Sequence, residues 1–215
     1  MAIITISRGS LSGGKKLAKC LSERLGYPTL GREVLQEAAE SMGVSEEIFR
    51  GKFEAAPGFW ARLTHERERY TLALQTALAE WCTRGDLVYH GLSGQFLLRD
   101  LPGVLRVRLV APLEMRTKAL QDTHPLMTPS QAEQFIQHVD QERSRWSQLI
   151  YGEDVRDPSH YDLTINLRML TLESACAVIA EAVAQPRFQI TDEVEEELFA
   201  FAAGCRERLS RATGA

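Results

Sequence analysis

The sequence has no apolar run long enough to cross a membrane and few residues that would cross-link the chain. No stretch reaches the roughly 18 apolar residues that a spanning helix needs. No basic segment of the kind that opens a secretory signal precedes the first apolar run. The four cysteines lie far apart, with no C-x-x-C pair among them. We therefore expect a cytoplasmic protein with reduced thiols and no membrane partner.

The chain also lacks an excess of positive charge. It carries 25 Lys and Arg against 29 Asp and Glu, a net charge of −4. A general nucleic-acid binder needs a basic surface that displaces counterions from the phosphate backbone, so we expect no nucleic-acid polymer as partner. A small anionic ligand stays open, because one local loop is enough to bind it. With 215 residues, 44% of them hydrophobic, the chain can bury one full core.

What the chain does have is a glycine-rich turn directly behind its first apolar run. The run at 2–7 is followed by RGSLSGGKK at 8–16 and then by an apolar-periodic, helical segment. The spacing of Gly9, Gly14 and Lys15 matches the G-x-x-x-x-G-K phosphate-binding loop. In such a loop backbone N–H groups and a helix N-terminus surround phosphate oxygens, and the lysine reaches the β and γ phosphates. The predicted phosphate-binding residues are Gly9, Ser10, Ser12, Gly13, Gly14, Lys15 and Lys16.

Strand and helix signals alternate along the rest of the chain. Alternation of this kind, with the glycine turn after the first strand, predicts an α/β fold with an open, mostly parallel sheet covered by helices on both faces. Ligands of such sheets gather at the carboxyl ends of the strands. The expected strands lie at 3–6, 27–30, 86–90, 104–110 and 161–166, and the expected helices at 17–25, 32–43, 59–82, 128–149 and 172–184.

The last part of the chain reads as a separate helical extension. Pro186 marks a boundary, so we expect a domain at 1–185 and an extension at 186–215. Acidic residues cluster at the start of the final helix and arginines at its end, as the helix macrodipole favours. The helix also carries an apolar stripe. The stripe could dock on the domain or on a second subunit, which would make a homodimer.

Several short motifs follow one another through residues 1–184. They are ITISRG at 4–9, SGGK at 12–15, LGYP at 25–28, REVL at 32–35, VLRV at 104–107, APLE-x-R at 111–116 and DP-x-x-YDL-x-IN at 157–166. In this order they resemble the cytidylate kinase-like family of P-loop nucleoside monophosphate kinases. The resemblance implies a three-layer P-loop NTPase fold with five parallel strands, an acceptor-binding region at about 32–85 and a lid at about 120–156. It also implies transfer of the ATP γ-phosphate to CMP or dCMP, with Mg²⁺.

The resemblance also implies roles for several arginines. Arg32 falls where the acceptor phosphate would be held by a guanidinium fork, although a solvated arginine at a helix start fits equally well. Arg143 and Arg145 lie in the expected lid, where an arginine neutralises the charge of the transferring phosphoryl group. Their i, i+2 spacing directs them differently, so we expect only one to face the phosphates. We expect Arg116 and Arg156 to be ordinary surface arginines.

Three positions depart from the pattern of an active kinase, and one of them is Leu92, an uncharged residue where the cytidylate kinases carry an arginine. Lys16 stands where a Ser or Thr hydroxyl normally holds Mg²⁺. His90 stands where the third core strand usually ends in an acidic residue, and Mg²⁺ prefers oxygen ligands. The metal ligands therefore stay undefined, and three functions stay open. The chain is a kinase of CMP, dCMP or a related monophosphate, a catalytically degenerate nucleotide-binding protein, or a P-loop kinase of another small acceptor.

Overall fold

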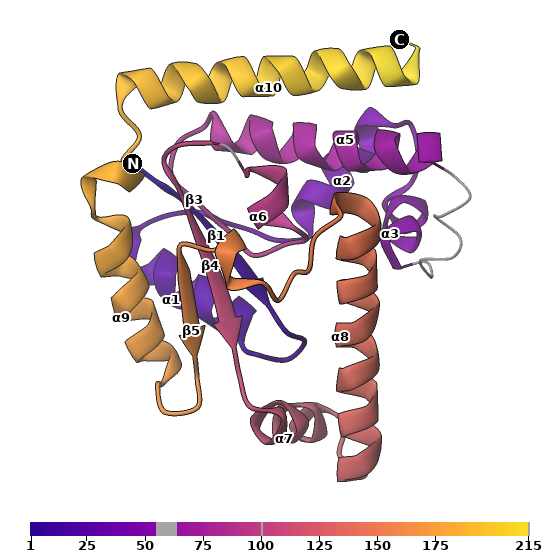
Figure 1. The fold of residues 1–215 in the computed structure, drawn as a ribbon, viewed down its shortest axis with the longest axis vertical. Helices are drawn as coiled ribbons and strands as arrows, with labels where there is room; N and C mark the ends of the chain where they lie inside the picture. The colour runs from indigo at the N-terminus through magenta and orange to yellow at the C-terminus, as the bar shows by residue number, and fades with distance from the viewer. Residues whose placement is uncertain (55–63, 100, 215) are drawn as a thin grey trace.

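The protein is described here by a computed structural model that covers residues 1–54, 64–99 and 101–214 (Figure 1). Part of the expected acceptor-binding region, residues 55–63, lies outside the described residues. None of the described helices is both long and apolar enough to cross a bilayer. The four cysteines are free thiols, and three of them are buried.

A five-stranded parallel sheet forms the centre of the molecule, as the sequence predicts (Figure 1). Every pair of neighbouring strands is parallel, in the order β2-β3-β1-β4-β5. The carboxyl ends of all five strands therefore meet at one edge. The strands are β1 (Ile3–Arg8), β2 (Thr29–Leu30), β3 (Leu87–Tyr89), β4 (Val104–Val110) and β5 (Leu163–Asn166).

Helices cover both faces of the sheet and bury a hydrophobic core on each. Neighbouring residues of β1 point to opposite faces, so Ile3 lies in one core and Ile4 in the other. The Ile4 core is covered by α1 (Gly14–Leu25) and α9 (Leu172–Val183). The Ile3 core is covered by α2 (Glu33–Ser41), α3 (Glu46–Glu54), α5 (Thr64–Cys82) and α6 (Gly94–Leu97).

A pair of helices stands beside the sheet and forms a satellite unit (Figure 1). It consists of α7 (Leu113–Thr123) and α8 (Pro129–Tyr151), which pack around Leu120, Ala132 and Ile136. A capping box begins α8, close to the start of the helix expected at 128–149. The Thr128 hydroxyl accepts a hydrogen bond from the Gln131 amide, and the Gln131 side chain accepts one from the Thr128 amide. Short 3₁₀ turns, η1 (Pro158–His160) and η2 (Pro186–Phe188), flank β5 and α9.

The carboxyl-terminal helix α10 (Asp192–Thr213) lies along α5 of its own chain (Figure 1). Its apolar stripe is buried in this contact, so docking on the domain, one of the two expected arrangements, is the one that the structure shows. Thr191 caps the helix by accepting a hydrogen bond from the Val194 amide. The buried residues of the stripe are Leu198, Ala202, Cys205 and Leu209.

Two adjacent residues of α10 provide a test of this docking. Leu198 is 2% exposed and packs in the core, whereas Phe199 is 52% exposed. We expect Leu198→Ala to lower the free energy of unfolding by about 2–5 kcal/mol, because it leaves a cavity in a packed interface. Phe199→Ala should change it by less than about 1 kcal/mol. Urea denaturation measures both, and equal effects of the two substitutions would contradict the docking.

Candidate functional site

The glycine loop joins the carboxyl end of β1 to the first turn of α1. Gly13 precedes the helix with a φ of 83°, a left-handed conformation that favours glycine. A Cβ atom on Gly14 would lie 2.0 Å from Cδ of Arg8. Glycine is therefore needed at Gly14 to let the Arg8 side chain cross the start of the helix. The loop amides and the N-terminus of α1 face the strand edge where phosphate is expected.

Four cationic side chains gather around this loop. Arg8 donates a hydrogen bond to the backbone oxygen of His90 at 2.6 Å. Burial, together with the nearby charges of Arg143 and Arg32, lowers the pKa of Arg8 to about 10. Lys15 lies close enough to influence the ionisation of His90. The sequence reasoning missed Arg8, because an arginine at a strand end has no pattern that marks it as a ligand.

One carboxylate lies at the edge of this cationic group. Oε2 of Glu33 accepts a hydrogen bond from the Gly31 amide at 2.7 Å. A Cβ on Gly31 would lie 2.6 Å from Cε1 of His90 and 3.3 Å from that same carboxylate oxygen. Backbone hydrogen bonds lower the pKa of Glu33, and the charges of His90 and Lys15 lower it further. Glu33 therefore presents an ionised carboxylate beside the histidine that stands in the position of the usual acid.

Helix α8, which lies in the region where the lid is expected, is fastened to the loop by three residues, which we call the clasp: Ser10, Arg116 and Asp140. Asp140 accepts hydrogen bonds from the backbone N–H and the hydroxyl of Ser10, both at 2.8 Å. Its second oxygen pairs with Arg116 at 2.5 Å, and Arg116 also donates to the Ser10 backbone oxygen at 3.3 Å. Ser10 is thus engaged by the lid. The expectation that Arg116 is a surface arginine is wrong, because its side chain is only 14% exposed.

The structure brings one of the two lid arginines to the site. Arg143 lies near both Arg8 and Asp140, and the burial of its guanidinium lowers its pKa. Arg145 instead pairs with Glu142 at 2.7 Å on a side of the helix where it is 64% exposed. The expectation that only one of them faces the site is in agreement with this placement. The surface position expected for Arg156 is confirmed, since it pairs with Asp154 and is 70% exposed.

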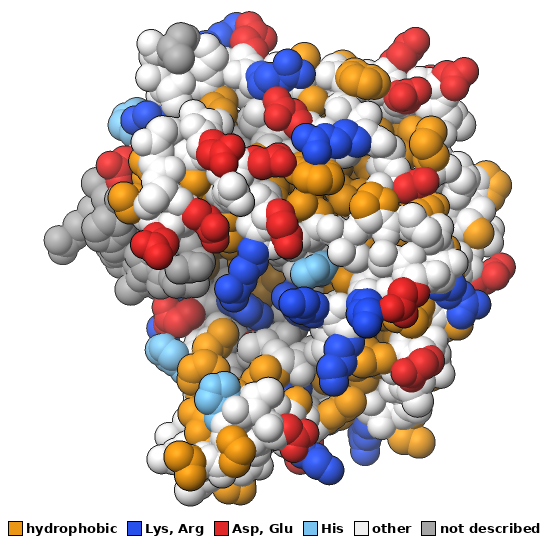
Figure 2. All heavy atoms as spheres, turned by 180° about the vertical axis from the view of Figure 1, so that it is seen from behind, with side chains coloured by type: hydrophobic (Ala, Val, Ile, Leu, Met, Phe, Trp, Pro, Cys, Tyr) orange, Lys and Arg blue, Asp and Glu red, His pale blue; other side chains and the backbone are white. Residues whose placement is uncertain are grey.

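The cations of the site have no acidic partner of their own. In the part of the chain that the structure describes, no carboxylate forms an ion pair with Arg8, Lys15, Arg32 or Arg143. The hydroxyl of Ser12 is buried without a hydrogen-bond partner. Figure 2 shows Lys and Arg side chains gathered with a histidine beside a hollow in the middle of one face. Uncompensated cations beside an unsatisfied buried hydroxyl form a site for a polyanion.

Comparison with known proteins places this geometry in a family. The model of the cytidylate kinase-like family matches residues 3–168. The chain belongs to the cytidylate kinase-like family. The cytidylate kinase of Thermococcus sibiricus is 26% identical over 182 residues, which cover 84% of this chain and 87% of the relative. The cytidylate kinase of Pyrococcus horikoshii is 24% identical over 182 residues, which cover 84% and 88%.

Solved structures share the fold at low identity. An uncharacterized protein from Eubacterium ventriosum superposes with a TM-score of 0.66 at 16% identity, covering 85% of this chain and 98% of that protein. A protein from Thermus thermophilus superposes with a TM-score of 0.52 at 18% identity, covering 86% and 98%. The expected fold, a five-stranded parallel sheet with helices on both faces, is confirmed by the sheet itself and by the family. The family supports a phosphotransferase acting on a nucleotide or another small molecule.

The structure shows where two of the residues that depart from the usual kinase pattern, Lys16 and His90, lie in this cytidylate kinase-like protein. Lys16 is exposed on the first turn of α1, and His90 is half-buried at the end of β3. Among the described residues no three His, Cys, Asp or Glu side chains are grouped as a metal site. Mg²⁺ is often held by only one or two carboxylates together with substrate phosphates and waters. The position of Glu33 fits that requirement.

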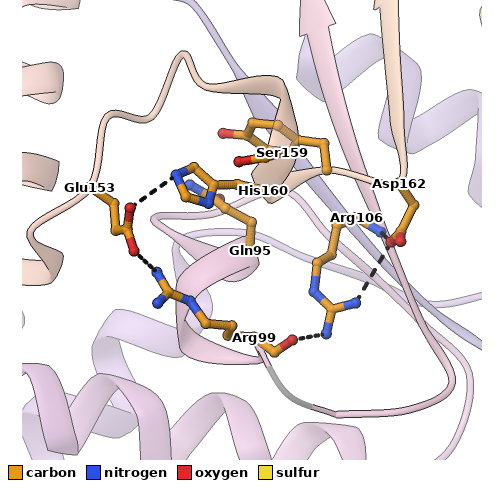
Figure 3. A pocket seen from close by; sticks show the side chains of 8 residues that line it. Gln95, Arg99, Arg106, Glu153, Ser159, His160 and Asp162 are labelled. Atoms are coloured by element: carbon orange, nitrogen blue, oxygen red, sulfur yellow. Dashed lines mark hydrogen bonds and ion pairs between the residues drawn. The ribbon is translucent and has the colours of Figure 1, made fainter.

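A second cavity, of about 290 Å³, lies on the Ile3 face of the sheet between α6 and η1 (Figure 3). Its charged side chains satisfy one another: Arg99 pairs with Glu153 at 3.2 Å, and Arg106 pairs with Asp162 at 3.6 Å. His160 also faces Glu153, and its side chain is only 13% exposed. These pairs tie η1 to the sheet, and the cavity has no group of uncompensated cations.

The histidine at the site should titrate at low pH. Burial and the charge of Arg8 lower the pKa of His90 below its ordinary value. The unfolded chain then binds more protons than the folded one, so the free energy of unfolding should fall as the pH drops below about 6.5. We expect a low NMR titration midpoint for the His90 ring, raised in Arg8→Gln. A His90 midpoint that Arg8→Gln leaves in place would contradict this assignment.

Proposed function

We propose that this protein is a nucleoside monophosphate kinase that transfers the γ-phosphate of ATP to CMP, dCMP or a related monophosphate. The observation that carries the proposal is the group of Arg8, Lys15, Arg32 and Arg143 around the glycine loop, without a carboxylate partner among the described residues. Two nucleotides bring several phosphate charges together during transfer, and a cluster of this size suits that total. Catalysis of such a transfer consists mostly of positioning and charge stabilisation.

Each cation has a role that follows from its place. Lys15 and the loop amides would bind the β and γ phosphates of ATP, and the unsatisfied Ser12 hydroxyl would donate to a phosphate oxygen. Arg32, at the start of α2 behind β2, would hold the acceptor phosphate. Arg143, on the lid, would neutralise the charge of the transferring group. Arg8 lies within electrostatic reach of Arg32 and Arg143 and so between the two phosphates.

The metal ion implied by this chemistry has one suitable ligand. Glu33 would hold Mg²⁺, directly or through a water, because its carboxylate is ionised and lies within electrostatic reach of Lys15. Bound Mg²⁺ supplies positive charge to the phosphate oxygens during transfer. His90 beside it stays neutral at pH 7 and adds no competing charge.

The acceptor is proposed from the relatives. Two relatives that match 84% of this chain are cytidylate kinases. A cytidine monophosphate is therefore the first candidate for the acceptor. The proposed acceptor region is 32–85, and the proposed lid is 120–156, which contains α8. The second candidate function is nucleotide binding without transfer. It is favoured by Lys16 in the hydroxyl position and His90 in the acid position.

An acceptor panel separates these functions. Pure protein is incubated with ATP and Mg²⁺ and with CMP, dCMP, UMP, AMP or a set of non-nucleotide hydroxyl compounds, and ADP release is followed. We expect CMP or dCMP to give the largest stimulation. Stimulation only by a non-nucleotide compound would replace the acceptor, and ATP binding without stimulation by any compound would make the protein a nucleotide-binding protein.

We propose further that α10 packs on the domain of its own chain and does not form a homodimer. Its buried stripe is already occupied by α5, so a homodimer through this helix would have to use the opposite side, where Phe199 is exposed. Sedimentation velocity of the parent and of Phe199→Glu tests this. A monomeric parent is expected, and a dimer that Phe199→Glu dissociates would overturn the proposal.

A further inference from the structure

The clasp between the lid and the glycine loop depends on the absence of a side chain at Gly9 as well as on the three side chains that form it. A Cβ atom on Gly9 would lie 2.9 Å from Nη1 of Arg116 and 3.5 Å from Oδ2 of Asp140. A side chain at Gly9 would therefore push against both charged partners. The first glycine of the loop thus has a second consequence in this chain, because it leaves room for the lid to approach.

The charged side chains of the clasp are largely buried, and this strengthens their interaction. The side chains of Arg116 and Asp140 are 14% and 29% exposed. Burial alone would raise the pKa of Asp140, but the hydrogen bonds from Ser10 and Arg116 lower it below its ordinary value. Asp140 is therefore ionised and fully engaged at neutral pH. Charge-assisted hydrogen bonds of this kind are stronger than neutral ones.

Asp140 and Arg143 share one face of α8. They are three residues apart, a spacing that places side chains next to each other on a helix. The charge of Asp140 reaches Arg143, and the charge of Arg143 reaches Arg8. The helix between them is regular and continues for 23 residues. A grip at Asp140 thus determines where the guanidinium of Arg143 lies.

We propose that Asp140 is a positioning residue: by holding α8 to Ser10 and Arg116, it sets Arg143 over the cationic site. This inference rests on the proposed function, in which Arg143 stabilises the transferring phosphoryl group. The same loop that would bind the ATP phosphates carries Ser10, so a change in the loop passes directly to the lid arginine. Asp140 itself touches no substrate in this account.

The kinetic test compares Asp140→Ala with a control on the same helix. A misplaced catalytic group costs about 100-fold in rate, so kcat should fall about 100-fold, and ATP binding should weaken by the same factor as in Arg143→Ala. Glu142→Gln removes a carboxylate that pairs only with the exposed Arg145 and should leave kcat within about twofold. Arg116→Ala should lower kcat as well. The double variant with Asp140→Ala should be no slower than the worse single variant, because both break one clasp.

A second readout does not depend on activity. Amide hydrogen exchange by mass spectrometry is compared at residues 9–13 and 139–146 in the parent, in Asp140→Ala and in Glu142→Gln. We expect faster exchange at both segments in Asp140→Ala alone. We also expect Arg143→Ala to weaken ATP binding in the parent but not in the Asp140→Ala background.

Two results would overturn the inference. Unchanged exchange at both segments in Asp140→Ala would show that the clasp does not hold the lid in solution. Faster exchange with kcat unchanged, or with the effect of Arg143→Ala on ATP binding undiminished, would show that Arg143 is placed without it. If no acceptor stimulates the parent, the proposed function fails by itself. Hydrogen exchange, and the effect of Arg143→Ala on ATP binding in the two backgrounds, would then still show whether Asp140 holds the lid.

Discussion

Replacing Lys15 with alanine should reduce ATP-dependent turnover on the order of 1000-fold, with weaker ATP binding. Lys15 follows the loop at the start of α1, and its charge reaches His90 and Glu33 beside the loop. In the proposed mechanism Lys15 neutralises the β and γ phosphates. Initial rates with the best acceptor, and ATP titration by calorimetry, measure the two effects.

Lys16 supplies the matched control for this prediction. It has the same charge, lies next in the chain and is exposed on the first turn of the same helix. Both lysines are exposed, but the charge of Lys15 is the one that reaches His90 and Glu33 at the site. We therefore expect Lys16→Ala to change turnover by less than about threefold, because its charge is screened by solvent and directed elsewhere. Equal losses in Lys15→Ala and Lys16→Ala would mean that general positive charge, rather than the position of Lys15, supports nucleotide binding. A fully active Lys15→Ala would refute the assignment of the loop.

The lid arginines form the second prediction with a large expected effect. Arg143→Ala should lower kcat on the order of 1000-fold, the usual contribution of an arginine that meets the transferring phosphoryl group. Its guanidinium is close to Arg8 at the site. The pKa of Arg143 is lowered by burial, yet the group remains charged at pH 7 and needs an anion to compensate it.

Arg145 is the control that shows whether the effect on kcat depends on the position of the arginine or only on its positive charge. It lies two residues away and pairs with Glu142 on an exposed side of α8, so Arg145→Ala should leave kcat within about twofold. Single-turnover measurements with pre-bound acceptor separate an effect on transfer from one on binding. A larger loss in Arg145→Ala than in Arg143→Ala would reverse the assignment, and would imply that the lid rotates when substrate binds.

Much of the fold follows from local sequence patterns. The strands at 3–8 and 104–110 are β-branched and apolar, and both faces of the sheet are covered, so their signals are nearly continuous. The start of α8 could be placed because Thr128 and Gln131 form a capping box that depends only on neighbours in the chain. The short or weakly patterned helices α3, α6 and α7 were not predicted. The four residues of α6 are too few to show a helical period.

The sequence predicted only the part of the site that lies within one continuous segment. The glycine loop depends on spacing along the chain, and so Gly9 to Lys15 were identified. The importance of Asp140 could not be predicted, because its contact with Ser10 joins positions 130 residues apart. Arg8 and Glu33 were missed for the same reason, since their significance comes from His90 on another strand. Contacts between distant segments need the assembled sheet, which places the ends of its strands together.

The central claim is that this loop and its four cations transfer a phosphoryl group between nucleotides. It is tested most directly by ³¹P NMR of ATP, Mg²⁺ and CMP incubated with the pure protein, with Lys15→Ala as the parallel sample. The account predicts that the signals of ATP and CMP decline together while those of ADP and CDP grow, and that Lys15→Ala shows neither change over the same period. ATP that stays intact in the presence of CMP, dCMP and the other acceptors, although calorimetry shows that it binds, would contradict the account.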